Sequence, residues 1–167
     1  MKSCIYYFLV LQSNNTKIIQ IGANDGDDLL KKFNNDFKDK ISYIGVEPQE
    51  TPFEKLKKNY QGFKNFNLIQ GCVGKKGKFK FYYLNDNYKE YCKKNNLKFG
   101  DGTSSLIKEN LSRRLIKNNL NPETYINKFD LDVFPLEELL KNNNIESNNF
   151  KDIDLLQIDA EGYDDEV

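Results

Sequence analysis

A short apolar run that ends in two closely spaced glycines is the feature that most constrains the fold of this chain. The run, "KIIQIG", covers residues 17–22, and "ANDGDD" follows it, so that Gly22 and Gly26 bracket a turn. Glycine adopts backbone angles that other residues avoid, and it lets the main chain turn sharply or approach a ligand closely. The segment therefore predicts a buried strand, a tight turn and a helix over residues 25–37, where Leu and Phe recur at helical spacing.

The alternation of strand and helix continues along the chain. It predicts one α/β domain with a mainly parallel sheet and helices on both faces, and 167 residues are a usual length for a single domain. Thr51 and Glu54 form a capping-box pattern that predicts the start of a helix over residues 51–60. Two more helices are expected over residues 105–117 and from Pro135 onward. Further strands are expected over residues 42–47, 66–73, 129–134 and 154–159.

An alternating run, "KFKFYYL", covers residues 78–84 and follows a turn that contains Gly74 and Gly77. The short turn and the period of two predict an antiparallel hairpin between this run and the strand of residues 66–73. No element is predicted for the polar residues 85–98 that follow.

Composition excludes several classes of function. The chain carries 25 basic and 25 acidic residues, so its net charge does not favour nucleic acid or an anionic membrane as a partner. It has no histidine, which excludes a histidine-ligated metal and leaves Asp, Glu, Lys or Tyr as a general base. Cys4, Cys72 and Cys92 lack the spacing of a metal site, and we expect free, buried thiols in a reducing compartment.

The N-terminal residues 1–15 contain an apolar run between Cys4 and Leu11. This run is too short to cross a membrane, which takes about 20 residues. No cleavage site of small residues follows it, so a signal peptide is not expected. We expect residues 1–15 to pack against a domain formed by residues 16–167, and the protein to be cytoplasmic.

Three of the expected strand ends carry candidate ligand-binding residues. In an open parallel sheet, ligands bind beyond the carboxyl ends of the strands. Glu47 lies 25 residues after Gly22, near the offset at which an acidic side chain binds ribose hydroxyls, and Asp159 and Glu161 follow the last strand. In the alternative interpretation the glycines only form a turn, Glu47 is a solvated strand end, and the last two carboxylates cap a helix.

The charges beside the turn favour one class of cofactor. A pyrophosphate needs exposed N–H groups at a helix N-terminus, and Asp25, Asp27 and Asp28 would each repel it by about 1–4 kcal/mol at about 4 Å. Asn24 also replaces the middle glycine of the dinucleotide motif. The turn therefore favours S-adenosylmethionine, which is cationic and has no phosphate. A nicotinamide-dependent oxidoreductase stays as the less favoured enzyme.

Five motifs, "IIQIGANDG", "YIGVEP", "GTSSL", "PLEELL" and "DLLQIDAEGYDDEV", occur in an order that resembles the FkbM family of S-adenosylmethionine-dependent methyltransferases. The resemblance covers residues 16–167. It implies a Rossmann-like class I methyltransferase fold and O-methylation of a hydroxyl on a sugar or another small-molecule or glycan acceptor.

The resemblance also assigns roles to residues of this sequence. The assigned residues are Gly22, Ala23, Asn24 and Gly26 in the cofactor turn, Glu47 at the ribose, Cys72 and Val73 beside the adenine, and Asp159 and Glu161 at the site of methyl transfer. Either of the last two is the expected general base, and two carboxylates are too few to predict a metal site. Ser104 and Ser105 could line the cleft, although helix capping is the expected role.

Members of this fold continue past the last strand expected here. We therefore expect the chain that stops at Val167 to be a fragment, a truncated product, or a subunit whose open sheet edge is covered by a partner or by self-association. A non-catalytic remnant that binds the cofactor is the second interpretation, and acceptor selectivity is expected to come from residues 85–98 and from segments beyond Val167.

Overall fold

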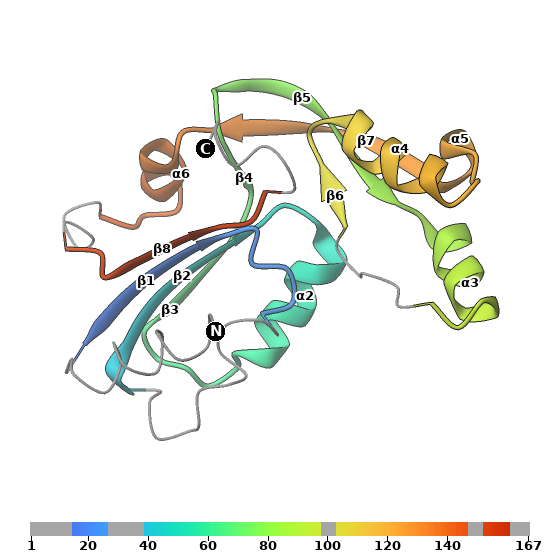
Figure 1. Cartoon of the computed structure of the whole chain (residues 1–167). Helices are drawn as coiled ribbons and strands as arrows, with labels where there is room; N and C mark the ends of the chain where they lie inside the picture. The colour runs from blue at the N-terminus through green and yellow to red at the C-terminus, as the bar shows by residue number, and fades with distance from the viewer. Residues whose placement is uncertain (1–14, 27–38, 98–102, 147–151, 161–167) are drawn as a thin grey trace.

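The computed structural model describes residues 15–26, 39–97, 103–146 and 152–160 (Figure 1). Its strands form two sheets of four. Sheet A consists, in spatial order, of β3 (Phe66–Gln70), β2 (Ile41–Glu47), β1 (Thr16–Ile21) and β8 (Leu155–Ile158), and all neighbours are parallel. Sheet B consists of β4 (Cys72–Val73), β7 (Ile126–Phe134), β5 (Gly77–Leu84) and β6 (Ser104–Ser105).

Sheet A confirms the predicted α/β fold with a mainly parallel sheet. The chain passes from β1 to β2 and β3 on one side, and it later returns to β8 on the other side of β1. This reversal of strand order lies beside the carboxyl end of β1, which is the position where open α/β sheets bind their ligands. The glycine turn that follows β1 therefore lies at the switch point.

Helices cover both faces of sheet A. Alternate residues of β1 point to opposite faces, so that Ile18 packs on the side of α2 (Glu50–Asn59) while Ile19 packs on the side of α6 (Leu136–Asn142). The core on the α2 side contains Ile18, Ala23, Ile41, Tyr43, Phe53, Leu56 and Tyr60. The core on the α6 side contains Ile19, Ile21, Ile44, Val46, Ile69, Val73, Leu139 and Leu140.

One polar pair is buried within the core on the α2 side. Tyr43 of β2 is fully buried, and its hydroxyl donates a hydrogen bond of 2.7 Å to Oε1 of Gln20 in β1. Burial, followed by the nearby Tyr60 and Glu47, raises the pKa of Tyr43 well above its ordinary value. The hydroxyl therefore stays protonated and acts as a donor that links the two central strands.

The predicted hairpin between residues 66–73 and 78–84 is wrong. The first segment divides at Gly71 into β3 and β4, which belong to different sheets. β5 pairs antiparallel with β7 along its whole length, and the end of β7 lies between β4 and β5, where Val133 is opposite both Cys72 and Gly77. The strand expected over residues 129–134 is correspondingly longer, because its pairing with β5 extends back to Ile126.

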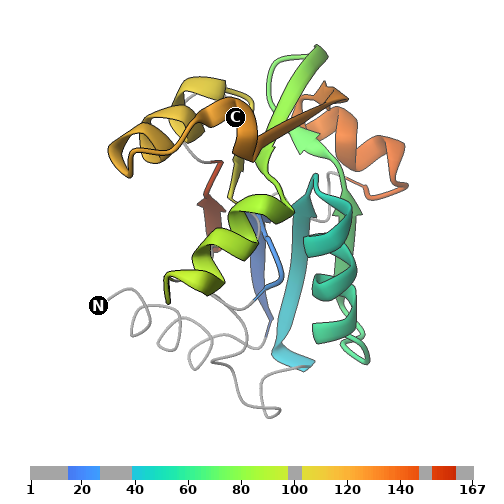
Figure 2. The same ribbon diagram turned by 90° about the vertical axis from the view of Figure 1, so that its right-hand side faces the viewer.

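Helices α3 (Asp86–Lys94), α4 (Lys108–Lys117) and α5 (Pro122–Tyr125) form a lobe beside sheet B (Figure 2). Its buried core consists of Leu84, Tyr88, Cys92, Leu111 and Leu115. α3 was not predicted, although Asn85 accepts a hydrogen bond from the Tyr88 N–H and caps the helix. The spacing of Tyr88 and Cys92, four residues apart on the buried face, was the signal that could have identified it.

Two predicted helix starts also differ from the structure. α2 begins at Glu50 with Gln49 as its N-cap and no side-chain cap, so Thr51 lies inside the helix and does not form a capping box. α4 begins at Lys108, because Ser105, where the helix was expected to begin, pairs with Tyr82 of β5 as part of β6. α6 was predicted from Pro135 and begins one residue later at Leu136, with Pro135 as its N-cap.

Some expectations fall partly or wholly on segments outside the described residues. They include the packing of residues 1–15, the helix after β1 beyond Gly26, and the burial of Cys4. Cys72 and Cys92 are free, buried thiols, as predicted. Within the described ranges, none of the helices combines the length and the apolar character that a membrane span needs.

Replacing Tyr43 with Phe should lower the free energy of unfolding by about 1–3 kcal/mol, because Gln20 Oε1 loses its donor inside the core. The double variant Gln20→Met/Tyr43→Phe should recover part of this loss, since neither polar group then remains buried. Urea denaturation of the four proteins in this cycle measures the coupling. Strictly additive losses would show that the two side chains do not interact.

Candidate cofactor and active site

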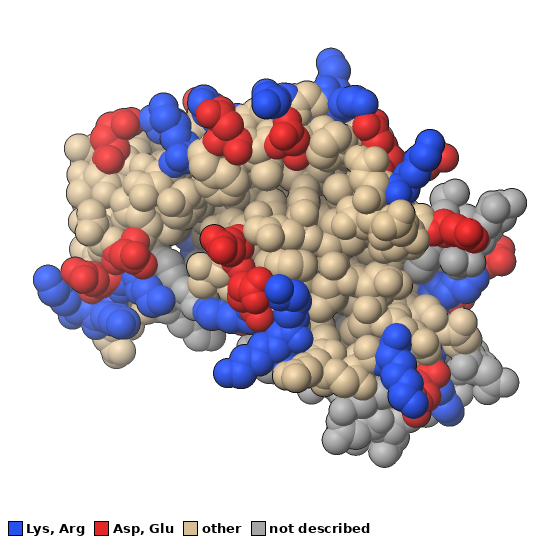
Figure 3. Space-filling view, turned by 180° about the vertical axis from the view of Figure 1, so that it is seen from behind, with Lys and Arg blue, Asp and Glu red and all other residues tan. Residues whose placement is uncertain are grey.

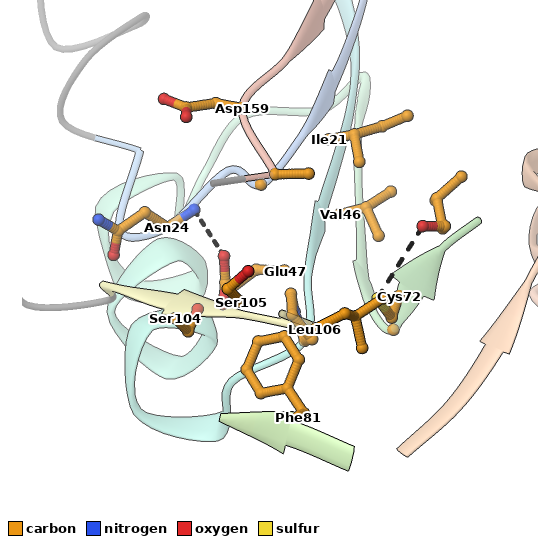
Figure 4. Close-up of a pocket in the computed structure, with 15 residues that line it drawn as sticks. Ile21, Asn24, Val46, Glu47, Cys72, Phe81, Ser104, Ser105, Leu106 and Asp159 are labelled. Atoms are coloured by element: carbon orange, nitrogen blue, oxygen red, sulfur yellow. Dashed lines mark hydrogen bonds between the residues drawn. The ribbon is translucent and has the colours of Figure 1, made fainter. Parts of the chain in front are cut away.

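A pocket lies at the carboxyl ends of β1, β2 and β8 and extends under β6 of sheet B (Figure 4). The pocket and its open mouth together enclose about 710 Å³ of space. The lining residues are Ile21, Gly22, Asn24, Val46, Glu47, Pro48, Gly71, Cys72, Val73, Phe81, Ser104, Ser105, Leu106, Asp159 and Ala160.

The turn after β1 is held by hydrogen bonds from its own backbone. Four N–H groups donate to acceptors within the protein: Gly22 and Ala23 to the Val46 carbonyl at 3.0 and 2.9 Å, Asn24 to the Glu47 carboxylate at 2.9 Å, and Gly26 to the Ala23 carbonyl at 2.9 Å. These donors are therefore directed at the protein. They do not form the cluster of outward N–H groups that binds a phosphate.

Both glycines of the turn have positive φ angles, +76° for Gly22 and +79° for Gly26, but their surroundings differ. A Cβ on Gly22 would lie 2.0 Å from the carbonyl oxygen of Asp159, so this glycine lets the turn pass against the end of β8. A Cβ on Gly26 would lie 2.4 Å from the ring of Tyr60, whose hydroxyl donates to the Gly26 carbonyl. Gly26 is thus required for packing against the end of α2.

Glu47 ends β2 inside the pocket, and only 4% of its surface is exposed. Oε2 accepts the Asn24 N–H and Oε1 accepts the Gln49 N–H, each at 2.9 Å. The carboxylate therefore joins the turn after β1 to the loop that begins α2. The interpretation of Glu47 as a solvated strand end is wrong, because the side chain is buried and hydrogen-bonded.

Burial raises the pKa of Glu47 to about 7, although the hydrogen bonds from Gln49 and Asn24 lower it, and the charge of Asp25 raises it further. A carboxyl group with this pKa is present in both protonation states near neutral pH. Donors that reach the pocket from a ligand would favour the ionised form, because they add hydrogen bonds to the carboxylate.

Cys72 and Val73 of β4 form a wall of the pocket, directly after the chain has passed from sheet A to sheet B at Gly71. Both are buried, and burial, followed by the charge of Glu47, raises the pKa of the Cys72 thiol to about 12. The thiol is therefore protonated at neutral pH and behaves as a small apolar side chain. The two side chains therefore present an apolar wall to the pocket.

Asp159 lies at the end of β8, on the side of the pocket opposite Phe81 (Figure 4). Its N–H donates to the Ile21 carbonyl at 2.9 Å, which fixes the main chain beside β1, while the residue itself is exposed. Glu161, the second candidate base, lies outside the described residues.

Six of the predicted site residues line the same pocket: Gly22, Asn24, Glu47, Cys72, Val73 and Asp159. Ala23 and Gly26 do not line it. Ala23 is buried in the core on the α2 side, and Gly26 contacts Tyr60. Both residues shape the turn from behind the pocket, and the functional role assigned to each residue stays a prediction.

Ser104 and Ser105 line the pocket, and the expected capping role is wrong. The N-cap of α4 is Ile107, and Ser105 Oγ instead accepts the Ile107 N–H at 3.0 Å in a turn that precedes the helix. Phe81 also lines the pocket and was not among the predicted residues. No local pattern indicated it, because its position depends on the long-range pairing of β5 with β7.

Within the ranges that the structure describes, no group of three or more Cys, Asp or Glu side chains could hold a metal ion. The acidic side chains that line the pocket are those of Glu47 and Asp159. The chemistry available from the described lining is therefore hydrogen bonding, apolar contact and carboxylate proton transfer.

Comparison with known families gives one match. The family model for the methyltransferase FkbM domain matches residues 20–167, which include the glycine turn, Glu47 and the end of β8. No curated protein and no solved structure matches the chain.

Gly22→Ala should unfold the protein or strongly destabilise it, because the new Cβ would overlap the Asp159 carbonyl. Gly62→Ala is the matched control: Gly62 has a φ of +92°, but a Cβ added there would have no atom within 4 Å. The control should cost only the strain of a positive φ, about 1–2 kcal/mol. Thermal and urea unfolding measure how much stability each of the two variants loses. Equal losses would show that the close approach of Gly22 to the end of β8 does not contribute to stability.

The stability of the protein should fall as pH rises from about 4.5 to 7. In this window folded Glu47 retains a proton that the unfolded chain has released, since its pKa rises from 4.5 to about 7 on folding. The shift corresponds to a total loss of about 3 kcal/mol, complete above the folded pKa.

Urea denaturation at pH 5 and pH 8 measures this difference. Glu47→Gln should lose the pH dependence while also losing one of the two backbone hydrogen bonds. Glu54→Gln, an exposed substitution on α2, should keep it. An unchanged slope in Glu47→Gln would assign the pH dependence to another group.

Proposed function

This chain belongs to the FkbM methyltransferase family, and on that premise we propose that it transfers a methyl group from S-adenosylmethionine to a hydroxyl oxygen of a small-molecule or glycan acceptor. The observation that carries this proposal is the buried carboxylate of Glu47, which faces the pocket at the carboxyl end of β2. The described residues around this carboxylate fit a cationic nucleoside cofactor in their hydrogen bonding and their apolar contacts.

The Glu47 carboxylate can accept hydrogen bonds from a ribose while it also accepts those from the Asn24 and Gln49 N–H groups. Each carboxylate oxygen has two lone-pair positions, and the Asn24 and Gln49 N–H groups use one position on each oxygen. One acceptor position therefore remains on each oxygen for the two ribose hydroxyls. Because its backbone partners fix the carboxylate before any ligand binds, little conformational entropy is lost on binding.

The rest of the pocket favours a cofactor without phosphate. The N–H groups of Gly22, Ala23, Asn24 and Gly26 donate to the protein, so among the described residues these four are not directed at a pyrophosphate. Val46, Val73 and the protonated Cys72 thiol supply apolar contact for an adenine ring. When bound, S-adenosylmethionine supplies an electrophilic methyl group on a sulfonium.

Asp159 is the described residue best placed to take the proton of the acceptor hydroxyl. It lies at the switch point beside the turn, and its main chain is fixed by the hydrogen bond to Ile21. Its side chain is open to solvent, so the proton can pass on to water after transfer. The chain offers no histidine for this step, and a carboxylate within reach of the hydroxyl is sufficient as a base.

Isothermal titration calorimetry with S-adenosylmethionine, S-adenosylhomocysteine and NAD tests the cofactor. We expect binding of the first two and none of NAD. Glu47→Ala should weaken S-adenosylhomocysteine binding about tenfold or more, and Glu47→Gln, which keeps the shape, should weaken it less. Glu54→Ala is the exposed control, and circular dichroism shows whether each variant is folded.

A methyl-transfer assay distinguishes an active enzyme from a non-catalytic subunit that only binds the cofactor. Transfer of a labelled methyl group to a panel of glycosides should occur with the wild type and fall about 100-fold or more in Asp159→Asn, whose amide cannot act as a base. Binding of S-adenosylhomocysteine without transfer to any acceptor would favour the non-catalytic subunit. Binding of NAD alone would overturn the proposed function.

A further inference from the structure

The ribbon formed by β5 and β7 has two chemically different faces. Residues that pair directly across antiparallel strands point to the same side, so the register assigns each side chain to a face. One face carries Lys78, Lys80, Tyr82, Lys128, Asp130 and Asp132, with ion pairs from Lys80 to Asp130 and from Lys78 to Asp132. The other face carries Phe79, Phe81, Tyr83, Asn127, Phe129 and Leu131, and none of these six is charged.

Three aromatic rings on the uncharged face, those of Phe81, Tyr83 and Phe129, form a continuous aromatic strip. The Phe129 ring centroid lies 5.3 Å from that of Phe81 and 5.9 Å from that of Tyr83. Phe129 is 37% exposed, so the strip presents apolar surface to solvent. Asn127 borders the strip and donates a hydrogen bond of 3.4 Å to the Tyr83 hydroxyl.

The aromatic strip is continuous with the pocket at two points. Phe81 lines the pocket directly and is 4% exposed, so one end of the strip is already part of the pocket wall (Figure 4). Tyr83 pairs with Ser104 of β6, which also lines the pocket. A molecule that rests on Phe129 and Tyr83 therefore lies next to the space assigned above to the cofactor.

We propose that the aromatic strip of Phe81, Tyr83 and Phe129, with Asn127 at its border, binds the ring of the methyl acceptor, and that this acceptor is an uncharged sugar. The inference rests on the proposed function and names the acceptor class for the same pocket. Aromatic faces pack on the C–H faces of a sugar ring. Asn127 Oδ1 accepts from Asn85 at 3.2 Å and one Nδ2–H donates to Tyr83, so the second Nδ2–H and the Tyr83 O–H are the donors for the sugar hydroxyls.

The distribution of charge over the two faces of the ribbon favours an uncharged acceptor over an anionic one. Lys78, Lys80 and Lys128 lie on the opposite face of the ribbon, where the first two pair with aspartates, so all three are directed away from the strip. Figure 3 shows positive and negative side chains along the top edge of the molecule and an area without charged side chains below them. The six residues of the uncharged face supply no cation for a carboxylate or a phosphate, and burying such a group there would be unfavourable.

Saturation-transfer NMR with methyl glycosides of neutral hexoses, and with methyl β-glucuronide as the anionic comparison, tests the inference. The wild type, loaded with S-adenosylhomocysteine, should bind at least one neutral glycoside and bind the glucuronide at least tenfold more weakly. Phe129→Ala should weaken glycoside binding about fivefold or more, and Phe129→Tyr should restore it. Lys128→Ala, the adjacent residue on the charged face, is the matched control and should bind as the wild type does.

Cofactor affinity distinguishes failure of this inference from failure of the proposed function. S-adenosylhomocysteine should bind Phe129→Ala and the wild type equally, because the strip is assigned to the acceptor. A loss of cofactor affinity in this variant would assign the strip to the adenine and overturn the inference. Unchanged glycoside binding in Phe129→Ala, absence of neutral glycoside binding, or equal binding of the glucuronide would also overturn it. If the wild type does not bind S-adenosylhomocysteine, the proposed function itself fails.

Discussion

The hydrogen bonds that the Glu47 carboxylate accepts from the Asn24 and Gln49 N–H groups connect the parts of the pocket. One bond holds the glycine turn after β1, and the other holds the loop that begins α2. α2 in turn reaches back to the turn, where Asn59 donates to the Asp25 carbonyl at 2.7 Å. The buried side chain of Glu47 therefore fixes the end of β2, the glycine turn and the start of α2 relative to one another. Its burial disfavours the charged carboxylate, which is why its pKa is raised.

The second constraint is the division of one extended segment between two sheets. Gly71 separates β3 from β4, and its N–H donates to the Glu47 carbonyl at 3.2 Å. The pairing of β4 with β7 then brings sheet B over the carboxyl ends of sheet A. Because of this placement, Phe81 and β6 complete the pocket wall. Sheet B thus adds the surface from which an acceptor class can be inferred.

The sequence predicted the elements of sheet A well, because each of them carries its own periodic pattern and its own turn residues. β1, β2 and β8 were expected at nearly their observed positions, and the strand ends that bring Gly22, Glu47 and Asp159 together followed from that order. Sheet B was predicted poorly. The run over residues 78–84 was correctly seen as a strand, but its partner lies about 50 residues away in β7, and no local pattern specifies such a pairing.

The capping box of α2 shows the same limit. Thr51 and Glu54 match the local signature, but the hydrogen bond between the Gln49 N–H and Glu47 fixes the chain so that the helix begins earlier. The sequence by itself determined the α/β class, the glycine turn and the acidic residue at the end of β2. These features follow from the spacing of apolar residues and from the backbone freedom of glycine, which are both local properties of the chain. Only the tertiary structure decided that Glu47 is buried, that the turn's N–H groups face inward, and that Phe129 lies beside the pocket, since each depends on contacts between segments distant in the chain.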